Sequence, residues 1–241
     1  MLSLNDIIDW KDSSVPDPKV EQVVGVDNFQ DPWFLRKGLE LSKAIGVIPG
    51  HKGTGFLIAN SLIMTNWHVL RQPDWAAGDS IVFDFEQNED GLSTTPDKII
   101  LDPDTFFYSN EAFDVAVVAV QGTPGLTRGK VNLRSLGTVF EDSRVNIIQH
   151  PGAGFKKIAI RDNGIKFFDD NIIQYWTDTE KGSSGSPLFD DKWDIIGLHY
   201  RADNAPAPAP GVGKIYFNEG HRITAIIKAL EDDNPEIKTM L

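Results

Sequence analysis

Short apolar runs separated by turn residues are the feature that most restricts the fold of this chain. Glycine (21) and proline (14) are plentiful, and both residue types punctuate secondary structure. Many short strands divided by such turns predict an all-β sandwich or a pair of barrels. The runs predicted as strands are 44–48, 53–59, 62–65, 80–85, 98–101 and 113–120, and, after a connecting stretch at 122–138, 145–149, 155–161, 165–168, 172–177, 186–189, 193–200 and 213–217.

The two ends of the chain follow other patterns. Residues 1–30 are polar and contain prolines without a sustained period, so we expect an extended arm or a partly disordered segment. Asp31 and Pro32 suit an N-cap and a first helical position, which predicts a short helix over 32–43. From Ile223 onward, apolar residues recur at i, i+3, i+4 and i+7, which predicts a C-terminal helix.

Composition excludes several classes of protein. The 241 residues suit one large domain or two small ones that share a core. Without cysteine there is no disulfide, thiol nucleophile or thiolate metal site, and we expect neither a metal nor a cofactor. A net charge of −12 argues against general binding to nucleic acid or to an anionic membrane. We find no signal-peptide pattern and no apolar stretch that would span a bilayer, so we expect a cytoplasmic protein.

The segment Gly182-Ser183-Ser184-Gly185-Ser186-Pro187 is the first candidate for chemistry. A serine between glycines can lie on a tight, exposed turn, where backbone N–H groups converge on one point. This combination suits a nucleophile beside an oxyanion hole. The same pattern occurs in ordinary turns, so other residues must supply a base and an orienting acid.

His68 and Asp114 are the candidates for the base and the acid. His68 follows the apolar run 62–65, where a polar ring can face a cleft, although a structural histidine near the core would also fit. Asp114 opens the apolar strand 115–120. It is either a polar residue that only marks the end of a strand or the semi-buried carboxylate that holds a histidine in one tautomer.

The order His68, Asp114, Ser184 is the chain order of the chymotrypsin-type serine proteases. The stretches Thr65-Asn66-Trp67-His68-Val69, Asp114-Val115-Ala116-Val117 and Gly182-Ser183-Ser184-Gly185-Ser186-Pro187 resemble those of trypsin-like serine proteases. The resemblance covers about residues 41–231. It implies two six-stranded antiparallel β-barrels with short N-terminal and C-terminal helices. The parts would be an arm and helix at 1–40, the first barrel at 41–121, a connection at 122–140, the second barrel at 141–219, and a C-terminal helix and tail at 220–241.

The resemblance also implies the roles of the site residues. The cleft would lie between the barrels, with Ser184 attacking the scissile carbonyl, His68 acting as the base and Asp114 orienting His68. Backbone N–H groups of Gly182 and Ser184 would bind the oxyanion. A protein or peptide substrate would pass through an acyl-enzyme on Ser184, without a cofactor.

One departure from trypsin points to a particular branch. Trypsin has an aspartate directly before the nucleophile, and Ser183 stands at that position, so the zymogen switch is expected to be absent. The chain instead resembles the bacterial glutamyl endopeptidases. In that branch a histidine after the nucleophile and a threonine before it bind an acidic side chain, and His199 and Thr179 match them. The tail Ile215-Tyr216-Phe217-Asn218-Glu219 also resembles that branch.

The alternative specificity rests on Asp178, which lies where trypsin keeps the aspartate that selects Arg or Lys. A buried carboxylate there would favour a basic side chain, or it would pair with His199 and keep that ring cationic. Acidic specificity is the favoured reading. Tyr200 and Arg201 complete the predicted substrate-binding set, and Arg201 departs from the branch, which has a glycine there.

The remaining features receive structural interpretations. His150 is predicted as a turn residue, His51 and His221 as exposed residues, and the alanine-proline stretch within 202–211 as a surface spacer. Acidic loops at 86–90 and 102–104 lack a calcium-loop motif. Two rivals stay open: a non-catalytic binding domain on the same fold, and a latent protease that a regulatory partner or a cleavage activates.

Overall fold

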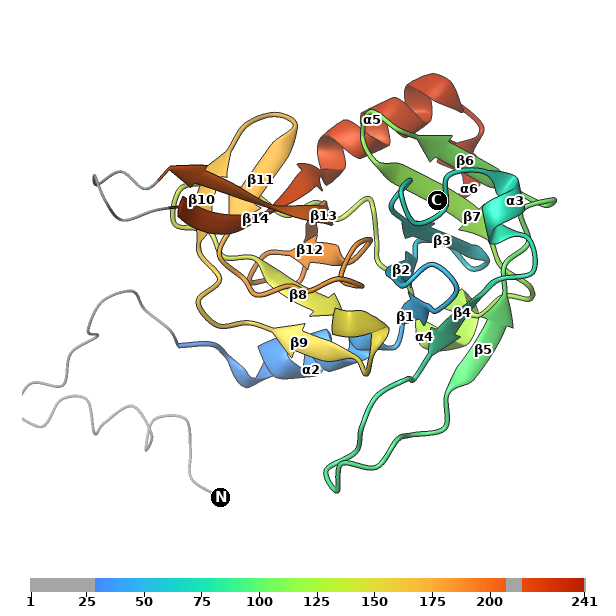
Figure 1. The fold of residues 1–241 in the computed structure, drawn as a ribbon, viewed down its shortest axis with the longest axis horizontal. Helices are drawn as coiled ribbons and strands as arrows, with labels where there is room; N and C mark the ends of the chain where they lie inside the picture. The colour runs from blue at the N-terminus through green and yellow to red at the C-terminus, as the bar shows by residue number, and fades with distance from the viewer. Residues whose placement is uncertain (1–28, 207–213, 241) are drawn as a thin grey trace, which may run out of the picture. The chain divides into compact units, whose positions relative to one another are not determined.

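Two antiparallel sheets of seven strands each dominate the described chain (Figure 1). The computed structural model describes residues 29–206 and 214–240. All helices and strands named below belong to the unit that begins at Pro32. Figure 1 shows the first sheet in blue to green and the second in yellow to red, side by side.

The first sheet has the strand order β5-β4-β1-β2-β3-β7-β6. Four of its strands, β1, β2, β3 and β7, are buried along their whole length, as expected from their continuous apolar runs. A bridge between Leu101 and Val120 joins the end of β5 to the end of β7, so the sheet curls onto itself. The strands are β1 (Ile45–Ile48), β2 (Gly53–Leu57), β3 (Leu62–Thr65), β4 (Ser80–Phe83), β5 (Asp97–Ile100), β6 (Phe107–Asn110) and β7 (Val115–Ala119).

The second sheet has the strand order β10-β11-β14-β13-β12-β8-β9. It curls in the same manner, because a bridge between Arg144 and Gly164 links the segments that precede β8 and β10. The strands are β8 (Asn146–Gln149), β9 (Lys157–Ala159), β10 (Ile165–Phe168), β11 (Ile172–Tyr175), β12 (Pro187–Phe189), β13 (Ile195–Pro206) and β14 (Lys214–Arg222).

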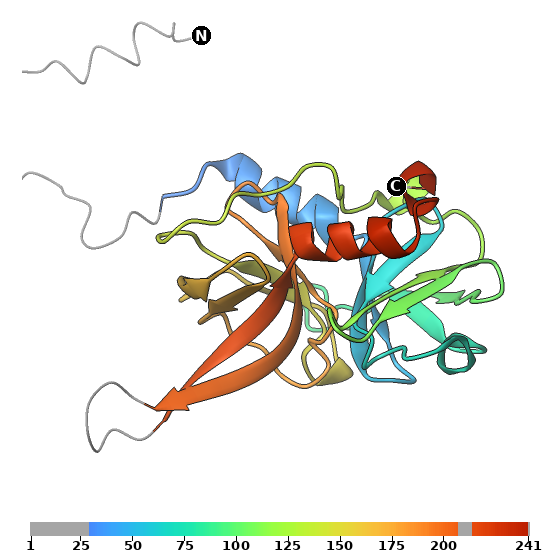
Figure 2. The same ribbon diagram turned by 90° about the horizontal axis from the view of Figure 1, so that it is seen from above.

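Both longer helices make contacts beyond the sheet that is next to them in sequence. Helix α2 (Pro32–Ser42) precedes the first sheet but packs on the second, where the Phe34 ring lies 5.0 Å from that of Trp193. Helix α5 (Ile223–Asp233) follows the second sheet and reaches the first, since Tyr108 Oη donates a 2.7 Å hydrogen bond to Asp233. Figure 2 shows both helices along one side of the two sheets. The shorter helices are α3 (Pro73–Ala76), α4 (Gly125–Arg128), η2 (Pro151–Ala153) and α6 (Ile237–Met240).

One apolar cluster joins the two sheets and both longer helices. It contains Phe34 of α2, Phe56 of the first sheet, Ile148 and Phe189 of the second, and Ile226 of α5. Removing apolar surface from water stabilises the folded state by about 25 cal/mol per Å². This shared core is therefore the main force that holds the two sheets together. The loops at the junction therefore have defined positions relative to one another.

The two-barrel, all-β prediction and the two terminal helices are confirmed. The predicted number of six strands per barrel is wrong, because each sheet has seven. Strand β6 escaped prediction since it is only half-buried and ends in the polar pair Ser109 and Asn110. In the second sheet, all seven apolar runs become strands.

Some predictions fall only partly on described residues. Of the alanine-proline stretch, residues 202–206 extend β13, and the part at 207–211 lies outside the described residues. Residues 1–28 of the arm predicted at 1–30 also lie outside the described residues. The domain boundaries stay predictions. Among the described residues, no helix is both long and apolar enough to cross a membrane.

Candidate active site

His68 and Asp114 meet at one edge of the first sheet. Strands β3 and β7 run antiparallel with Thr65 opposite Ala116, so the turn after β3 and the turn before β7 lie together. The Asp114 carboxylate accepts two hydrogen bonds from His68, one from the backbone N–H at 2.8 Å and one from Nδ1 at 2.7 Å. Because a carboxylate only accepts, Nδ1 carries the proton and Nε2 is left with its lone pair.

The local backbone explains this geometry. Asp114 has a φ of 44°, a left-handed conformation that aspartate tolerates better than most residues. Asn66 holds the turn, since its Nδ2 donates a 2.8 Å hydrogen bond to the Asp114 carbonyl. The Asp114 side chain is 13% exposed and that of His68 is 37% exposed. The acid is thus sheltered, while the ring of His68 reaches solvent.

The loop that carries Ser184 belongs to the second sheet but is bound to the first. Thr54 of β2 donates its N–H to the Ser184 carbonyl at 2.8 Å and its hydroxyl to the Gly182 carbonyl at 2.8 Å. Gly185 has a φ of 87°, and a Cβ on it would overlap the Thr54 carbonyl and the Thr65 hydroxyl. Only glycine fits this contact, and it places the serine loop against the strand that leads to His68.

The hydroxyl of Ser184 is open. Within the described ranges no hydrogen bond from Ser184 Oγ occurs, and none joins it to His68 Nε2. Catalytic hydrogen bonds in unliganded sites are often long and tighten only when substrate binds. The fold thus brings Ser184 to the neighbourhood of His68 through the contacts of its loop with β2 and β3.

Two backbone donors of the serine loop are also open. The N–H groups of Ser183, Gly185 and Ser186 donate to the carbonyls of Glu180, His199 and Ser183 at 2.9, 3.0 and 3.0 Å. The N–H groups of Gly182 and Ser184 have no acceptor in the described part of the chain. Buried backbone donors are almost always paired in folded proteins, so two neighbouring open donors mark a place for an anion or a polarised carbonyl.

Ser183 supports the loop from within. Its side chain is fully buried, and its Oγ accepts a 3.1 Å hydrogen bond from the N–H of Glu180. Gly182, with a φ of 98°, packs so closely on the loop 150–153 that a Cβ would overlap Ala153 N. The loop is therefore held by its own turn and by the neighbouring loop.

His199 is buried beside the serine loop. The ring is 3% exposed, its backbone N–H donates to the Ser186 carbonyl at 2.9 Å, and its Nδ1 lies 2.6 Å from Tyr175 Oη. Burial, together with the charge of His68, lowers the pKa of His199 to about 3, against a smaller opposing effect of the Glu219 backbone.

The alternative in which Asp178 pairs with His199 and keeps that ring cationic is wrong. The side chain of Asp178 is exposed, and its backbone carbonyl accepts a 2.8 Å hydrogen bond from Gln149. The pKa of His199 is lowered rather than raised, because dehydration of the buried ring dominates. His199 is neutral, not cationic, near pH 7.

Thr179 is part of a short hydrogen-bonded chain. Its hydroxyl donates to Asn218 Oδ1 at 2.6 Å, and Asn218 Nδ2 donates to the Thr177 carbonyl at 2.7 Å. Asn218 lies opposite Tyr175 in the pairing of β11 with β14. Thr179 and His199 are therefore linked through this pair of residues on adjacent strands.

Tyr200 and Arg201 converge on the buried carboxylate of Glu219. Tyr200 Oη, Arg201 Nη2 and Gln174 Nε2 all donate to it, the last two at 2.9 and 2.7 Å. Burial alone raises the pKa of Glu219, but these hydrogen bonds outweigh it and lower the pKa below its ordinary value. Arg201 also pairs with Asp203 at 3.0 Å, so its charge is compensated twice.

Sequence reasoning missed the roles of several residues here. Tyr175 and Gln174 lie in an ordinary apolar run, and no local signal singles them out. Asn218 and Glu219 were noticed only as part of a tail that resembles the glutamyl endopeptidases. Their partners come from other strands, so pairing of the strands had to be known first.

Three histidines outside the predicted site differ from expectation. His221 is not an exposed helix start: it lies on β14, its ring is stacked 4.3 Å from that of Tyr200, and burial lowers its pKa. His150 does begin a turn, η2, but it is fully buried, and burial lowers its pKa to about 4. His51 is half-buried, with its ring 4.9 Å from that of Trp75.

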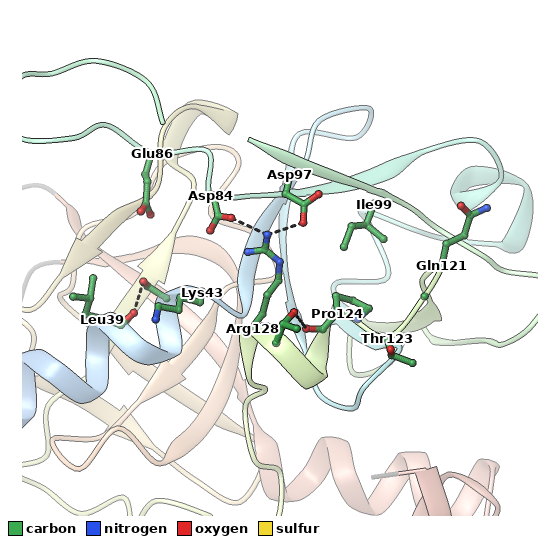
Figure 3. A pocket seen from close by; sticks show the side chains of 13 residues that line it. Leu39, Lys43, Asp84, Glu86, Asp97, Ile99, Gln121, Thr123, Pro124 and Arg128 are labelled. Carbon is green, nitrogen blue, oxygen red and sulfur yellow. Dashed lines mark hydrogen bonds and ion pairs between the residues drawn. The ribbon is translucent and has the colours of Figure 1, made fainter. Parts of the chain in front are cut away.

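A cavity of about 650 Å³ lies elsewhere, between α2, β5 and α4 (Figure 3). On its wall Arg128 Nη2 contacts the carboxylates of Asp84 and Asp97 at 2.7 and 2.6 Å. None of its lining residues is a predicted site residue. The described residues contain no group of three or more histidines and acids that would hold a metal ion.

Two curled sheets, the first carrying His68 and Asp114 and the second carrying the serine loop, are typical of the chymotrypsin fold. The family described as a trypsin-like peptidase domain matches residues 53–198. The chain belongs to this family.

Individual relatives agree with the fold. An uncharacterized protein, y4fB, of Sinorhizobium fredii is 28% identical over 88% of this chain, and the chain spans only 39% of its length. A solved Glu endopeptidase is 22% identical, with a TM-score of 0.55 over 79% of this chain and 89% of that one. The inactive form of the Rv3671c protease of M. tuberculosis is 20% identical, with a TM-score of 0.51 over 84% of this chain and 96% of that one. At these identities, the solved structures support the fold alone.

Proposed function

We propose that this protein is a serine endopeptidase that hydrolyses peptide bonds through an acyl-enzyme on Ser184. The observation that carries the proposal is the doubly bonded His68–Asp114 pair, whose Nε2 lone pair is free, beside a loop with an open serine hydroxyl. The open N–H donors of Gly182 and Ser184 add the third requirement of acyl transfer, a site for the oxyanion.

In the acylation step, Ser184 Oγ attacks the scissile carbonyl carbon while His68 Nε2 takes the hydroxyl proton. The carbonyl oxygen becomes an oxyanion that accepts hydrogen bonds from Gly182 and Ser184 N–H, and one such donor contributes about 3–4 kcal/mol in related chemistry. His68 then donates the proton to the leaving amine, and the C–N bond breaks. Asp114 stabilises the imidazolium throughout.

In the deacylation step, water replaces the departed amine. His68 Nε2 takes a proton from the water as its oxygen attacks the ester carbon, and the same donors hold the second oxyanion. The proton passes to Ser184 Oγ as the ester bond breaks and the carboxylate product leaves. No cofactor is needed.

The support of the serine loop favours activity without processing. Where trypsin has an aspartate that needs a new N-terminus, Ser183 is satisfied by Glu180 of its own turn. We therefore propose that the full chain is active as made. Activity that appears only after trimming, or only with a partner protein, would favour the latent alternative.

We propose that specificity depends on His199 and Thr179 rather than on Asp178. His199 contacts the serine loop through both backbone groups, whereas the carboxylate of Asp178 is exposed and offers no buried charge to a basic side chain. The side chain before the scissile bond is then one with oxygen atoms, such as the acidic residues and their amides.

The test is covalent labelling of the full chain with a fluorophosphonate, which forms a P–O bond to the activated serine and releases fluoride. We expect one adduct, located on Ser184 by mass spectrometry, and cleavage of short peptides. Ser184→Ala should abolish both, while the control Ser109→Ala, which changes a serine of β6, should keep both. An adduct in Ser184→Ala, or neither adduct nor cleavage in the unchanged chain, would exclude this function.

A further inference from the structure

Four consecutive peptide groups join Lys181 to Gly185, and their carbonyl oxygens all accept hydrogen bonds. In order from Lys181 to Ser184, the donors are Gly152 N–H at 2.6 Å, Thr54 Oγ1 at 2.8 Å, Ser186 N–H at 3.0 Å and Thr54 N–H at 2.8 Å. The N–H groups of the second and fourth peptide groups are bonded as well. Those of the first and third, which belong to Gly182 and Ser184, have no acceptor among the described residues.

The bonded carbonyls fix the directions of the two open N–H groups. In a trans peptide group the C=O and the N–H point in opposite directions, and the described residues contain no cis peptide bond. Because the Lys181 carbonyl points at Gly152, the Gly182 N–H points away from the loop of residues 150–154, which we call the η2 loop. The Ser184 N–H likewise points away from Ser186.

The two open donors depend on different parts of the molecule. The orientation of Ser184 N–H is set within its own turn, by Ser186, whereas that of Gly182 N–H is set by Gly152 of the η2 loop. Gly182 does not fix the orientation itself, because its φ is 98° and glycine adopts either sign of φ at little cost. If the peptide group between Lys181 and Gly182 rotated, its carbonyl oxygen would replace the N–H and would repel an oxyanion.

Thr54 determines where the η2 loop lies. The side chain is fully buried in β2. Its Oγ1 accepts a 3.1 Å hydrogen bond from the N–H of His150 and donates to the Gly182 carbonyl at 2.8 Å. A hydroxyl group has one proton and two lone pairs, so it can do both at once. Thr54 therefore ties the start of the η2 loop and the serine loop to the same point of β2.

The η2 loop keeps its shape through His150. The ring is fully buried, and its Nδ1 donates a 2.8 Å hydrogen bond to the Gly154 carbonyl, which only accepts. Between these two residues, Gly152 and Ala153 have left-handed backbones, with φ of 65° and 54°. Alanine adopts this conformation only where its surroundings hold it there. The loop is therefore held in the shape that presents Gly152 N–H to Lys181.

We infer that Thr54 is a positioning residue for the oxyanion site. Its hydroxyl holds the η2 loop against the serine loop, so that Gly152 keeps the Gly182 N–H available to the developing oxyanion. Thr54 itself need not touch the substrate. This inference rests on the proposed function, and it makes one of the two oxyanion donors dependent on a strand of the first sheet and on a loop distant from Ser184.

The first test compares Thr54→Val, which keeps the shape and removes the hydroxyl, with Thr54→Ser, which keeps the hydroxyl. The contact between an oxyanion and its donor is made in the transition state, so kcat should fall while KM stays within about twofold. We expect a loss of about 10- to 100-fold in kcat for Thr54→Val, somewhat less than when a donor is removed outright. Thr54→Ser should stay within about threefold of the unchanged chain.

Ser42→Ala is the control for loss of a buried hydroxyl. Ser42 Oγ donates a 2.7 Å hydrogen bond to the Leu39 carbonyl at the end of α2, so this variant should lose thermal stability and keep its kcat. An unchanged kcat in Thr54→Val, a rise in KM alone, or an equal loss of kcat in Thr54→Ser or Ser42→Ala would overturn the role given to Thr54.

Hydrogen exchange of the full chain labelled with ¹⁵N-glycine supplies a readout that does not need activity. Exchange reports local opening of hydrogen bonds. We expect Gly182 N–H to exchange about tenfold faster than Gly185 N–H, which donates to the His199 carbonyl at 3.0 Å. Thr54→Val should speed exchange of Gly152 N–H about tenfold and leave Gly185 nearly unchanged.

The exchange result separates failure of this inference from failure of the proposed function. Exchange of Gly182 as slow as that of Gly185, or an unaltered rate for Gly152 in Thr54→Val, would overturn the inference whatever the activity. The expected exchange pattern without an adduct on Ser184 would instead exclude the endopeptidase, and with it a catalytic purpose for Thr54.

Discussion

His68 and His199 are the same residue type in opposite hydrogen-bonding arrangements. Nδ1 of His68 donates to the carboxylate of Asp114, which leaves Nε2 as a base. Tyr175 is buried and has no other hydrogen-bond acceptor among the described residues, so its hydroxyl donates to Nδ1 of His199 and the ring proton lies on Nε2. The His68 side chain is 37% exposed and the His199 residue 3% exposed. The partner of Nδ1 and the access of water, not the ring itself, therefore decide what each histidine does.

The largest expected effect comes from giving His68 the arrangement of His199. In Asp114→Asn the amide NH₂ donates to Nδ1, which moves the proton to Nε2 and removes the base. If the proposed function holds, we expect kcat to fall about 10⁴-fold in steady-state assays of a cleaved peptide, the loss measured for this change in a serine protease.

Asp104→Asn is the control for that change, since Asp104 is an exposed acid of a distant loop. The kcat of Asp104→Asn should stay within twofold of that of the unchanged chain. If Asp114→Asn lowered kcat less than tenfold at unchanged thermal stability, Asp114 would not determine the tautomer of His68.

The next effect concerns Gly185, which contacts both the backbone of His199 and the strand that precedes His68. Its N–H donates to the His199 carbonyl, and its Cα faces Thr65 of β3. Gly185→Ala combines a strained φ with overlap on the backbone, so we expect a loss of about 2–4 kcal/mol in unfolding free energy. Urea unfolding measures it, with peptide cleavage as a second readout.

Gly78→Ala is the matched control for the glycine. Gly78 has a φ of 79°, but nothing lies within 4 Å of the Cβ that would be added. We expect about 1 kcal/mol from the strained φ alone. Equal losses for both glycines would show that the contact with β3 does not hold the serine loop.

Buried histidines should make the fold sensitive to acid. Burial lowers the pKa of His150 to about 4 and that of His199 to about 3. In the unfolded chain these rings bind protons below about pH 6.5, while the folded rings stay neutral. The contribution of these rings to the unfolding free energy is therefore fully present above pH 6.5. It declines as the pH falls toward the folded pKa values, by up to roughly 3 kcal/mol for His150 and roughly 5 kcal/mol for His199.

Thermal unfolding at pH 7.5 and at pH 4.5 measures this loss. His150→Gln and His199→Gln should each reduce the difference between the unfolding temperatures measured at the two pH values. His68→Gln, which changes an exposed ring, should reduce this difference less. If the His199→Gln chain lost as much stability in acid as the unchanged chain, burial of His199 would not contribute to the acid sensitivity, and the comparison of His199 with His68 would be wrong.

The smallest effect concerns the internal support of the serine loop. Ser183→Ala removes the acceptor of the Glu180 N–H, and we expect a loss of about 1 kcal/mol in unfolding free energy with acylation slowed a few-fold. Ser135→Ala removes a comparable bond, to Asp194 at 2.9 Å, and should destabilise equally without slowing acylation. Slowing in both variants would mean that stability, not the loop, limits the rate.

Sequence patterns anticipated much of this molecule because those patterns act over short distances. Apolar runs bounded by turn residues located nearly all the strands, and two glycines around a serine marked the loop of Ser184. Strand β6 was missed because it is half-buried and ends in polar residues. The prediction for His221 was wrong because the residues directly before helix α5 form the end of the long strand β14, which buries the ring.

The sequence by itself determined the all-β class and the terminal helices, and it named His68, Asp114 and Ser184 as the candidate site residues. Apolar periodicity, the conformational freedom of glycine and the order of residues along the chain can all be recognised from a short stretch of sequence. Only the tertiary structure decided the state of His199. Its partner, Tyr175, lies 24 residues away on another strand, and the loss of water around the ring depends on the packing of the whole second sheet. A tautomer and a pKa are properties of surroundings, and those surroundings exist only once the strands have paired.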